Sequence, residues 1–382
     1  MSGTRLLAVG SAAIYRLDAV YPQDWSAMDS WIKAQNDWIF GWITYDAKNG
    51  IEKLETRHPN LLEFPQVLLI VPQNVIRWKN GEREVLKGEW REEFHSIINE
   101  VSTDAHISVD MRARVEREAY IEAIHSLQRH IHYGNIYEVN YCQEYFAEVK
   151  LPDPLSLWKK LRTYTHAPFS AYVKHADLHV MCASPERYIK KSGSKIISQP
   201  IKGTIKRGMS EEEDVALKYR LVNSKKERSE NVMIVDLVRN DLSKFAVKGS
   251  VSVEELCSVH TFQTVHHLIS TISAEVKPGV SFSEVIRDTF PMGSMTGAPK
   301  IRAMELIDEI ELSARGLYSG TLGYITPEGD FDFNVVIRSM LYNDTKSYLS
   351  YSVGGAITAL SDPNEEYEEC QVKANALMLA LK

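Results

Sequence analysis

Apolar and polar positions along the chain alternate between strand-like and helix-like patterns. Up to about residue 105, short apolar runs such as "FPQVLLIVPQNVIRW" are separated by polar turns such as "KNGER", a pattern typical of strands. From Met111 to His132, apolar residues recur at helical spacing. The next segment, "YGNIYEVNYCQEYFAEV", alternates after a Gly-Asn turn and predicts a strand.

The rest of the chain predicts a mixture of strands and helices. A strand meander is expected over 168–204, and one long helix from Ser210 to Asp241, because Ser210 and Glu213 have the spacing of a capping box. Further helices are expected in "PGVSFSEVIRDTF", in "PKIRAMELIDEI" and from near Asn364. Because strands and helices do not alternate strictly, we predict an α+β fold with mostly antiparallel sheets.

Composition narrows the class of protein. The 382 residues are 44% apolar and 25% charged, with a net charge of −7, which argues against nucleic-acid binding but allows a local basic pocket for an anion. No apolar run approaches the roughly 20 residues of a membrane-spanning helix. The four cysteines form no CxxC pair, so a zinc or redox motif is absent and a cytoplasmic location is expected.

Two pairs of glutamates are candidates for metal binding. Glu227 and Glu230 lie three residues apart, as do Glu366 and Glu369, so each pair shares one face of its predicted helix and its charges repel. Glu230 also enters an apolar run, where an unpaired carboxylate is costly. A divalent cation would offset both costs, and oxygen-only ligands suit Mg²⁺. The alternative, favoured for either pair taken alone, is a solvated helix face.

Lys202 and Glu186 are candidates for catalysis. Lys202 follows a strand-like run in "SQPIKGTIKRG", where we expect a Gly-containing turn. Lysine has a pKa of ~10.4 and is a poor nucleophile unless its surroundings lower that value, so a solvated turn lysine is the simpler interpretation. Glu186 in "SPERYI" suits a general acid if it is desolvated. The alternative is a solvent-exposed carboxylate at the rim of a site, after a proline turn.

Three further features have weaker signals. His260 suits a polar pocket lining, but a structural histidine is the favoured interpretation. Arg338 lies in the apolar run "NVVIRSML" and needs an anionic partner, internal or bound. Gly354 and Gly355 bring bare backbone amides that could approach a carboxylate.

Taken together and in order, segments from about Tyr120 to the C-terminus resemble the chorismate-utilising enzymes, the family of anthranilate, aminodeoxychorismate, isochorismate and salicylate synthases. The residues that carry the resemblance are "GNIYEVNYCQ", "SPERYI", "QPIKGTIKRG", "RSENVMIVDLVRNDL", "SVHTFQTVHHLIS", "FPMGSMTGAPKIRAMELI", "GLYSGTLGY", "FNVVIRS", "GGAIT" and "SDPNEEYEE". The resemblance implies two large antiparallel sheets packed as a sandwich with helices outside. Residues 1–105 would then be the N-terminal part of that sandwich and 106–382 the chorismate-binding core.

The resemblance also implies roles for individual residues. Glu230 and Glu369 match direct Mg²⁺ ligands, and Glu227 and Glu366 match the residues that complete the acidic site. Glu186 matches the acid that protonates the departing C4 hydroxyl of chorismate. The positions that match substrate contacts are Ser294, Tyr318, Arg338, Gly354, Gly355, Lys373 and His260.

Lys202 distinguishes between branches of the family. Anthranilate synthases resemble this stretch but carry Ala in "PIAGT", whereas the aminodeoxychorismate synthases carry the Lys of "PIKGT" found here. The resemblance implies that Lys202 attacks C2 while Glu186 removes the C4 hydroxyl, and that ammonia then attacks C4. Isochorismate and salicylate synthases have a Lys base at the position of Glu138. Most amine-using relatives have Gln there, so Glu138 is a departure.

The favoured function is therefore that of component I of the aminodeoxychorismate synthases, the amination of chorismate toward p-aminobenzoate and folate. The alternatives are anthranilate synthesis, disfavoured by Lys202, and a non-catalytic chorismate-binding subunit, disfavoured by the intact catalytic set. We expect ammonia to come from a separate glutamine amidotransferase subunit, because no Gly-Cys-Gly nucleophile motif surrounds any cysteine. Neither nucleic acid nor a membrane is expected as a partner.

Overall fold

Two large sheets and one small sheet form the body of the computed structural model, which describes residues 4–98, 108–263 and 265–382. Within these residues the sheets have ten, seven and three strands, and their strand pairs are antiparallel. The predicted α+β class with large antiparallel sheets is thereby confirmed. The predicted boundary at residues 105 and 106 lies outside the described residues.

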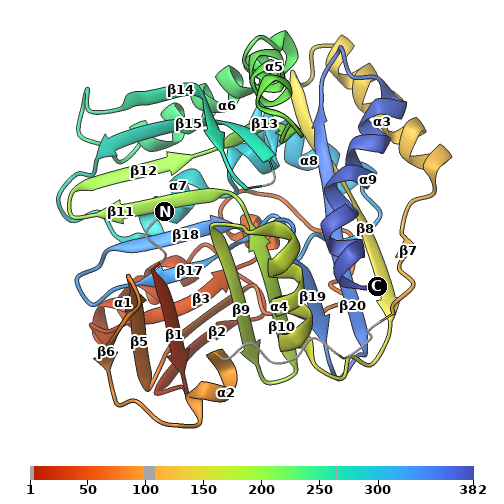
Figure 1. The fold of residues 1–382 in the computed structure, drawn as a ribbon. Coiled ribbons are helices and arrows are strands. Elements are labelled where there is room, and N and C mark those ends of the chain that lie inside the picture. The colour runs from red at the N-terminus through yellow and green to blue at the C-terminus, as the bar shows by residue number, and fades with distance from the viewer. Residues whose placement is uncertain (1–3, 99–107, 264) are drawn as a thin grey trace.

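The ten-stranded sheet combines strands from the first hundred residues with strands from the rest of the chain (Figure 1). Its order is β13 (Ile201–Lys206), β15 (Val265–Glu275), β12 (Lys195–Gln199), β11 (Arg187–Ser192), β18 (Phe331–Val335), β17 (Thr321–Ile325), β3 (Ile39–Ile43), β4 (Val67–Val71) and β2 (Ala13–Leu17), with β14 (Ser252–Thr261) paired to β15. The junction is the pairing of β3 with β17, in which Trp42 lies opposite Leu322.

The seven-stranded sheet is built around β8 (Glu138–Glu148) and β20 (Tyr348–Ile357), which pair over ten residues. Its order is β16 (Gly297–Ala298), β8, β20, β19 (Met340–Asn343), β10 (Leu178–Ser184) and β9 (Phe169–His175), with β7 (Arg112–Ala113) paired to β8. The three-stranded sheet contains β1 (Arg5–Val9), β5 (Asn74–Lys79) and β6 (Glu82–Lys87).

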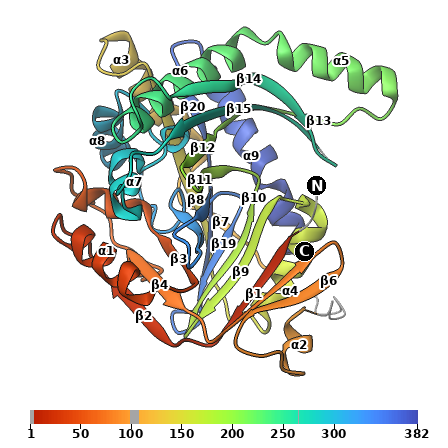
Figure 2. The same ribbon diagram turned by 90° about the vertical axis from the view of Figure 1, so that its left-hand side faces the viewer.

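Helices cover the sheets. Figure 1 shows α3, α4 and α9 beside the seven-stranded sheet, and Figure 2 shows α5 and α6 lying along β13, β14 and β15. The helices are α1 (Asp24–Gln35), α2 (Phe94–Ile98), α3 (Arg117–His132), α4 (Pro154–Thr165), α5 (Glu211–Val222), α6 (Lys225–Ser243), α7 (Phe282–Thr289), α8 (Lys300–Ile310) and α9 (Pro363–Ala380), with 3₁₀ turns η1 (Tyr45–Gly50) and η2 (Gly293–Met295). Among the helices of the described residues, none is both long enough and apolar enough to cross a membrane.

The hydrophobic core has two parts. One buried cluster joins the ten-stranded sheet to α6 and α7 and includes Trp42, Ile272 and Val285. The other lies between the seven-stranded sheet and helices α3, α4, α8 and α9, and includes Tyr120 and Leu377. Each cluster buries the apolar face of an amphipathic sheet against helices, which is how layered α+β domains are stabilised.

Two predicted helix boundaries are wrong. The helix expected from Met111 begins at Arg117, because Arg112 and Ala113 pair with β8 and the Arg114 guanidinium lies 3.8 Å from the ring centre of Phe146. The long helix expected over 210–241 is two helices. Asn223 leaves the helical conformation, and the Ser224 hydroxyl accepts a hydrogen bond from the Glu227 amide and so caps a new helix.

Candidate active site

Lys202 lies in a strand and not in the turn that the sequence predicts. It belongs to β13, whose pairing with β15 shifts register between Lys202 and Thr204. Gly203 adopts a φ of +82° at this bulge, and a Cβ there would lie 2.9 Å from Glu227 Oε2. Gly203 therefore supplies both the left-handed backbone and the space that let β13 approach α6. The bulge holds Lys202 beside a helix that carries two of the predicted acidic residues.

Lys202 forms an ion pair with Glu138 across the two large sheets. Its Nζ lies 3.0 Å from Glu138 Oε1, and the exposed fractions of the two side chains are 10% and 1%. Burial on its own lowers the pKa of Lys202, but attraction to Glu138, Glu230 and Glu186 outweighs burial and raises the pKa above the usual lysine value. Lys202 is therefore protonated and paired here, and it must lose a proton before it can act as a nucleophile.

Glu186 has the protonation behaviour of a general acid. It is buried directly before β11, where its Oε1 accepts a 2.7 Å hydrogen bond from Ser294 Oγ. Burial raises the pKa of Glu186 to about 7, although the Ser294 hydrogen bond and the Lys202 charge favour the ionised form. A carboxyl group with such a pKa carries a proton for part of the time near neutral pH and can donate it to a leaving group.

The glutamates of α6 and α9 face one another. Lys226 of α6 donates a 2.7 Å hydrogen bond to Glu366 of α9, which connects the two helices. Within α9, the Lys373 ammonium lies 2.6 Å from Glu369 and also donates to the Gly354 carbonyl at 2.7 Å. The structure thus brings together two glutamate pairs that lie about 140 residues apart in the sequence, with two lysine ammonium groups between them.

Electrostatics at this cluster favour an added cation. Burial, partly offset by Lys202, raises the pKa of Glu230 to about 8, and burial and Glu369 raise the pKa of Glu227. Glu230 Oε1 is buried without a hydrogen-bond partner, and an oxygen of this kind suits a hard cation. Within residues 4–98, 108–263 and 265–382, no three His, Cys, Asp or Glu side chains lie close enough to hold a metal ion as they stand. A cation would therefore draw the glutamates closer or replace a lysine.

Tyr318, which is buried, and Arg338, which is half-buried, lie beside the same cluster. The Tyr318 hydroxyl lies 3.5 Å from Cys142 Sγ, and Arg338 donates a 3.3 Å hydrogen bond to the Lys373 carbonyl. Arg338 has a φ of +52°, a conformation that costs free energy for a residue with a Cβ and that is common at functional sites. A Cβ on Gly354 would lie 2.4 Å from Cys142 Sγ, so only glycine fits the close approach of β20 to β8.

His260 and Gly355 have different surroundings. His260 lies in β14 with its side chain 35% exposed, and its Nε2 is 3.1 Å from the partly exposed carboxylate of Glu255. Gly355 borders the acidic cluster, because a Cβ there would lie 3.2 Å from Glu366 Oε2.

Lys226 was not predicted from the sequence. It lies directly before Glu227, and nothing in that position signals that its partner, Glu366, is on another helix.

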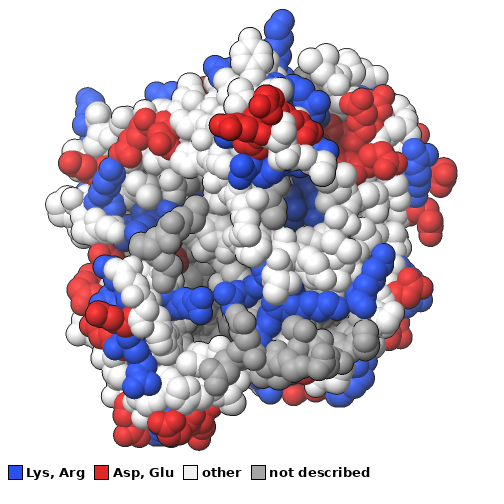
Figure 3. Space-filling model, in the orientation of Figure 1, with Lys and Arg blue, Asp and Glu red and all other residues white. Residues whose placement is uncertain are grey.

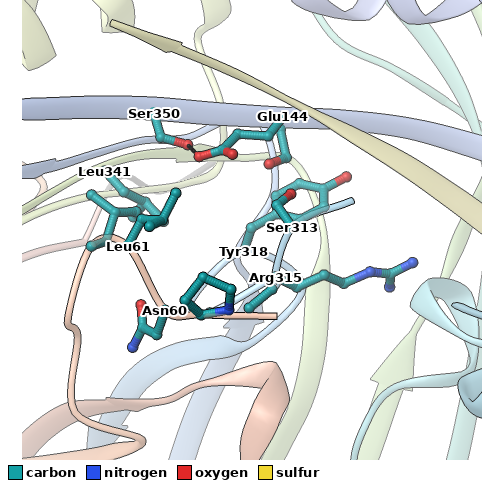
Figure 4. Close-up of a pocket in the computed structure, with 13 residues that line it drawn as sticks. Asn60, Leu61, Glu144, Ser313, Arg315, Tyr318, Leu341 and Ser350 are labelled. Carbon is teal, nitrogen blue, oxygen red and sulfur yellow. Dashed lines mark hydrogen bonds between the residues drawn. The ribbon is translucent and has the colours of Figure 1, made fainter. Parts of the chain in front are cut away.

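A separate pocket has Tyr318 in its lining (Figure 4). It measures about 380 Å³ with its open mouth, and its lining includes Asn60, Leu61, Glu144 and Ser350. Its buried carboxylate is already paired, because Glu144 accepts hydrogen bonds from Arg114, Tyr348 and Ser350. Of its lining residues, Tyr318 alone belongs to the predicted site, so the pocket is not the candidate active site.

The surface also carries positive charge in a hollow. On the face seen in Figure 3, the molecule is hollowed below α5, Lys or Arg side chains lie inside the hollow, and acidic side chains gather above it. A local basic recess is therefore present on a chain whose net charge is −7, and such a recess attracts an anionic small molecule.

This arrangement and the sequence motifs define a known class of enzyme. Residues 11–379 match the family described as chorismate binding enzyme, and the chain belongs to that family. The predicted fold is also found in a solved relative. Anthranilate synthase component I from Streptococcus pneumoniae superposes with a TM-score of 0.84 at 21% identity and covers 98% of this chain and 92% of its own.

Several of the curated relatives that the chain matches are aminodeoxychorismate synthases. The chain is 42% identical over 269 residues to the chloroplastic aminodeoxychorismate synthase of Arabidopsis thaliana, with 69% of this chain and 29% of the relative covered. It is 39% identical over 279 residues to aminodeoxychorismate synthase component 1 of Escherichia coli, with 73% of this chain and 61% of the relative covered. The chain therefore spans less than two thirds of the length of each.

Proposed function

We propose that the protein aminates chorismate at C4 with ammonia and releases 4-amino-4-deoxychorismate and water. One observation carries this proposal. The Lys202 ammonium and the Glu186 carboxyl group are both buried and lie close enough to affect each other's pKa. A nucleophile and an acid at one site match a double displacement. The names of the curated relatives favour the same reaction.

In the first displacement, the neutral amine of Lys202 attacks C2 of chorismate and forms a C–N bond. Both ring double bonds shift by one position, the C4–O bond breaks, and Glu186 gives its proton to the departing hydroxyl, which leaves as water. In the second, ammonia attacks C4, both ring double bonds shift back, and the C–N bond to Lys202 breaks. The new ammonium group returns one proton to Glu186. Two allylic substitutions thus replace one difficult direct substitution.

We also propose that the acidic cluster holds Mg²⁺. Glu230 and Glu369 would be the ligands, with Glu227 and Glu366 completing the site, and Ser294, Tyr318, Arg338, Gly354, Gly355, Lys373 and His260 are proposed to contact the substrate or the metal site. Bound there, the ion would neutralise a substrate carboxylate and stabilise negative charge. The unpartnered Glu230 oxygen supports this assignment.

Ammonia is proposed to come from a glutamine amidotransferase subunit. The relative from Escherichia coli is named component 1, which is consistent with a second component. We propose a cytoplasmic location, because the four cysteines are buried and unpaired, as is common in a reducing compartment.

A product assay tests the proposed function. The purified protein receives chorismate, Mg²⁺ and ammonium chloride, with and without added aminodeoxychorismate lyase. The proposal expects p-aminobenzoate only when the lyase is present. Anthranilate formed without the lyase would instead assign the protein to the anthranilate branch, and the absence of both products would leave a chorismate-binding subunit.

Lys202→Ala is expected to abolish formation of aminodeoxychorismate while chorismate binding is retained, because the nucleophile is lost and the carboxylate contacts are not. Intact-protein mass, measured after mixing with chorismate without ammonia, should show an adduct of chorismate minus water in the parent protein and none in the variant. Lys206→Ala, an exposed lysine of the same strand, is the control. Undiminished turnover by Lys202→Ala would contradict the covalent route.

A further inference from the structure

Glu138 is the direct partner of the proposed nucleophile, and we propose that it is the base that takes the proton from Lys202 before the attack on chorismate. This proposal rests on the proposed function and deepens it. The transfer runs along the 3.0 Å hydrogen bond from Lys202 Nζ to Glu138 Oε1. It gives a neutral amine and a neutral carboxylic acid within one buried pair.

The need for such a base follows from the geometry of the site. An ammonium group has no lone pair, so Lys202 must be neutral when it forms the C–N bond. The groups that attract its charge are carboxylates on several elements: Glu138 on β8, Glu186 before β11, Glu227 and Glu230 on α6, and Glu369 on α9. Of these, Glu138 is the one with a hydrogen bond to Nζ.

Glu138 is a deeply buried carboxylate with one unsatisfied oxygen. Its side chain is 1% exposed, and its second oxygen, Oε2, is buried without a hydrogen-bond partner. A buried carboxylate whose lone pairs are not satisfied pays for desolvation that a neutral acid largely avoids. An internal transfer removes both charges together, so neither is left buried without its partner.

Protons balance over the full cycle. Lys202 first gives one proton to Glu138, and its neutral amine then attacks C2, so the nitrogen of the adduct is a secondary ammonium. When ammonia displaces the lysine, the C–N bond electrons return to nitrogen and the amine leaves neutral. Glu138 then returns the proton, which restores the ion pair. The net reaction consumes one ammonia and releases one water.

If Glu138 is the base, the rate at which Lys202 attacks chorismate depends on pH differently with and without the Glu138 carboxylate. In the parent protein the proton stays within the pair, so forming the amine does not require release of a proton to solvent. With a glutamine at position 138 that proton must leave the protein. Over the pH range below the pKa of the lysine, the neutral fraction of an amine then rises about tenfold per pH unit.

The test compares Glu138→Gln with Glu138→Asp in single turnovers. Each protein is mixed with chorismate and Mg²⁺ without ammonia and quenched, and the Lys202 adduct is measured by intact-protein mass from pH 6 to 9. The ratio of the Gln variant rate to the parent rate is expected to rise about tenfold per pH unit. The Asp variant keeps a carboxylate, and its ratio should stay constant with pH. Glu186 is unchanged in all three proteins, so the pH dependence that it gives to the rate cancels in both ratios.

The pH dependence of the rate ratio decides the role of Glu138. If the ratio of the Glu138→Gln rate to the parent rate does not change with pH, Glu138 is not the base, even if the variant is slow. Chorismate affinity and the thermal unfolding midpoint verify that the variants are folded, and Glu138→Met replaces Glu138→Gln if the latter does not fold. If the parent protein forms no adduct but still makes aminodeoxychorismate, the covalent role of Lys202 fails. If it makes neither, the proposed function fails.

Discussion

At the scale of single residues, burial determines which groups carry protons. Glu186 and Glu230 both lose contact with water, and burial raises their pKa values to about 7 and about 8. Lys202 is equally buried, yet the surrounding carboxylates keep it charged. Strongly shifted pKa values in neighbouring groups are typical of sites that move protons. The structure therefore separates an acid, Glu186, from a lysine that needs a base.

Ser294→Ala should move the alkaline limb of the activity profile, where activity falls with rising pH, to higher pH. The acid form of Glu186 exists below its pKa of about 7, so kcat/KM for chorismate should fall as the pH rises through that value. The Ser294 hydroxyl donates to the carboxylate and stabilises its charged form. Its removal raises the pKa further and shifts the fall to higher pH.

The measurement is the pH profile of kcat/KM at a constant concentration of free ammonia. Ser294→Thr keeps the hydroxyl and serves as the control, with a profile that matches the parent. A fall at the same pH in the Ala variant would show that Glu186 is not the group that titrates.

Single residues were also where the sequence was most informative. Glu227, Glu230, Glu366 and Glu369 could be selected as two charged pairs at helical spacing, and the structure brings them together. The partner of Lys202 could not be selected. Glu138 precedes Lys202 by 64 positions, and nothing in local periodicity connects a strand of one sheet with a strand of another.

At the scale of elements, α6 and α9 determine the acidic cluster. The Lys226–Glu366 ion pair joins them, and Gly203 lets β13 pack against α6. The sequence predicted both helices, but it extended α6 back to Ser210 and placed Lys202 in a turn. Both errors have one cause. Apolar spacing alone cannot detect either feature, because the helix restart is set by the local cap of Ser224 on the Glu227 amide and the β-bulge at Gly203 by the pairing of β13 with β15.

Glu230→Gln should weaken activation by Mg²⁺. The unpartnered Glu230 oxygen is the strongest candidate for a ligand, and an amide oxygen carries no charge to replace it. Loss of a residue that only supports a metal ligand typically costs about 10–100-fold in metal affinity, so loss of a ligand should raise the Mg²⁺ concentration for half-maximal activity by at least about tenfold.

The measurement is a Mg²⁺ titration of the activity after treatment with a chelator. Glu368→Gln changes an exposed glutamate of α9 and should leave the titration unchanged. Full activity of the parent protein in excess chelator would remove the reason for a metal at this cluster.

At the scale of the whole molecule, Arg315 connects parts of the chain that are distant in sequence. Its guanidinium pairs with Glu311 after α8, and it donates to the carbonyls of Met295 in η2 and Asn140 in β8. It also lies 4.7 Å from the ring centre of Tyr45 in η1. The strands β2, β3 and β4 of the first hundred residues belong to the ten-stranded sheet, and Arg315 adds a polar connection from η1 to the other sheet.

Arg315→Met should lower the free energy of unfolding by about 3–5 kcal/mol, the usual cost of removing one partner from a buried ion pair. The side chains of Arg315 and Glu311 are 3% and 5% exposed. Glu311 would keep the Cys142 amide as a donor at 2.9 Å, but its charge would have no counterion. Urea denaturation followed by circular dichroism measures the change, with the slope against urea checked for constancy.

The double variant Arg315→Met/Glu311→Leu separates two contributions to the loss of stability. One is the missing attraction between Arg315 and Glu311, and the other is the buried Glu311 charge left without a counterion. Replacing both partners by apolar side chains removes the uncompensated carboxylate, so the double variant should be more stable than Arg315→Met alone. That order is expected because the main penalty in the single variant is a buried charge and not a missing contact. If the double variant is instead the less stable of the two, the pair acts mainly through its attraction and its hydrogen bonds, and the connection between η1 and β8 depends on that polar geometry.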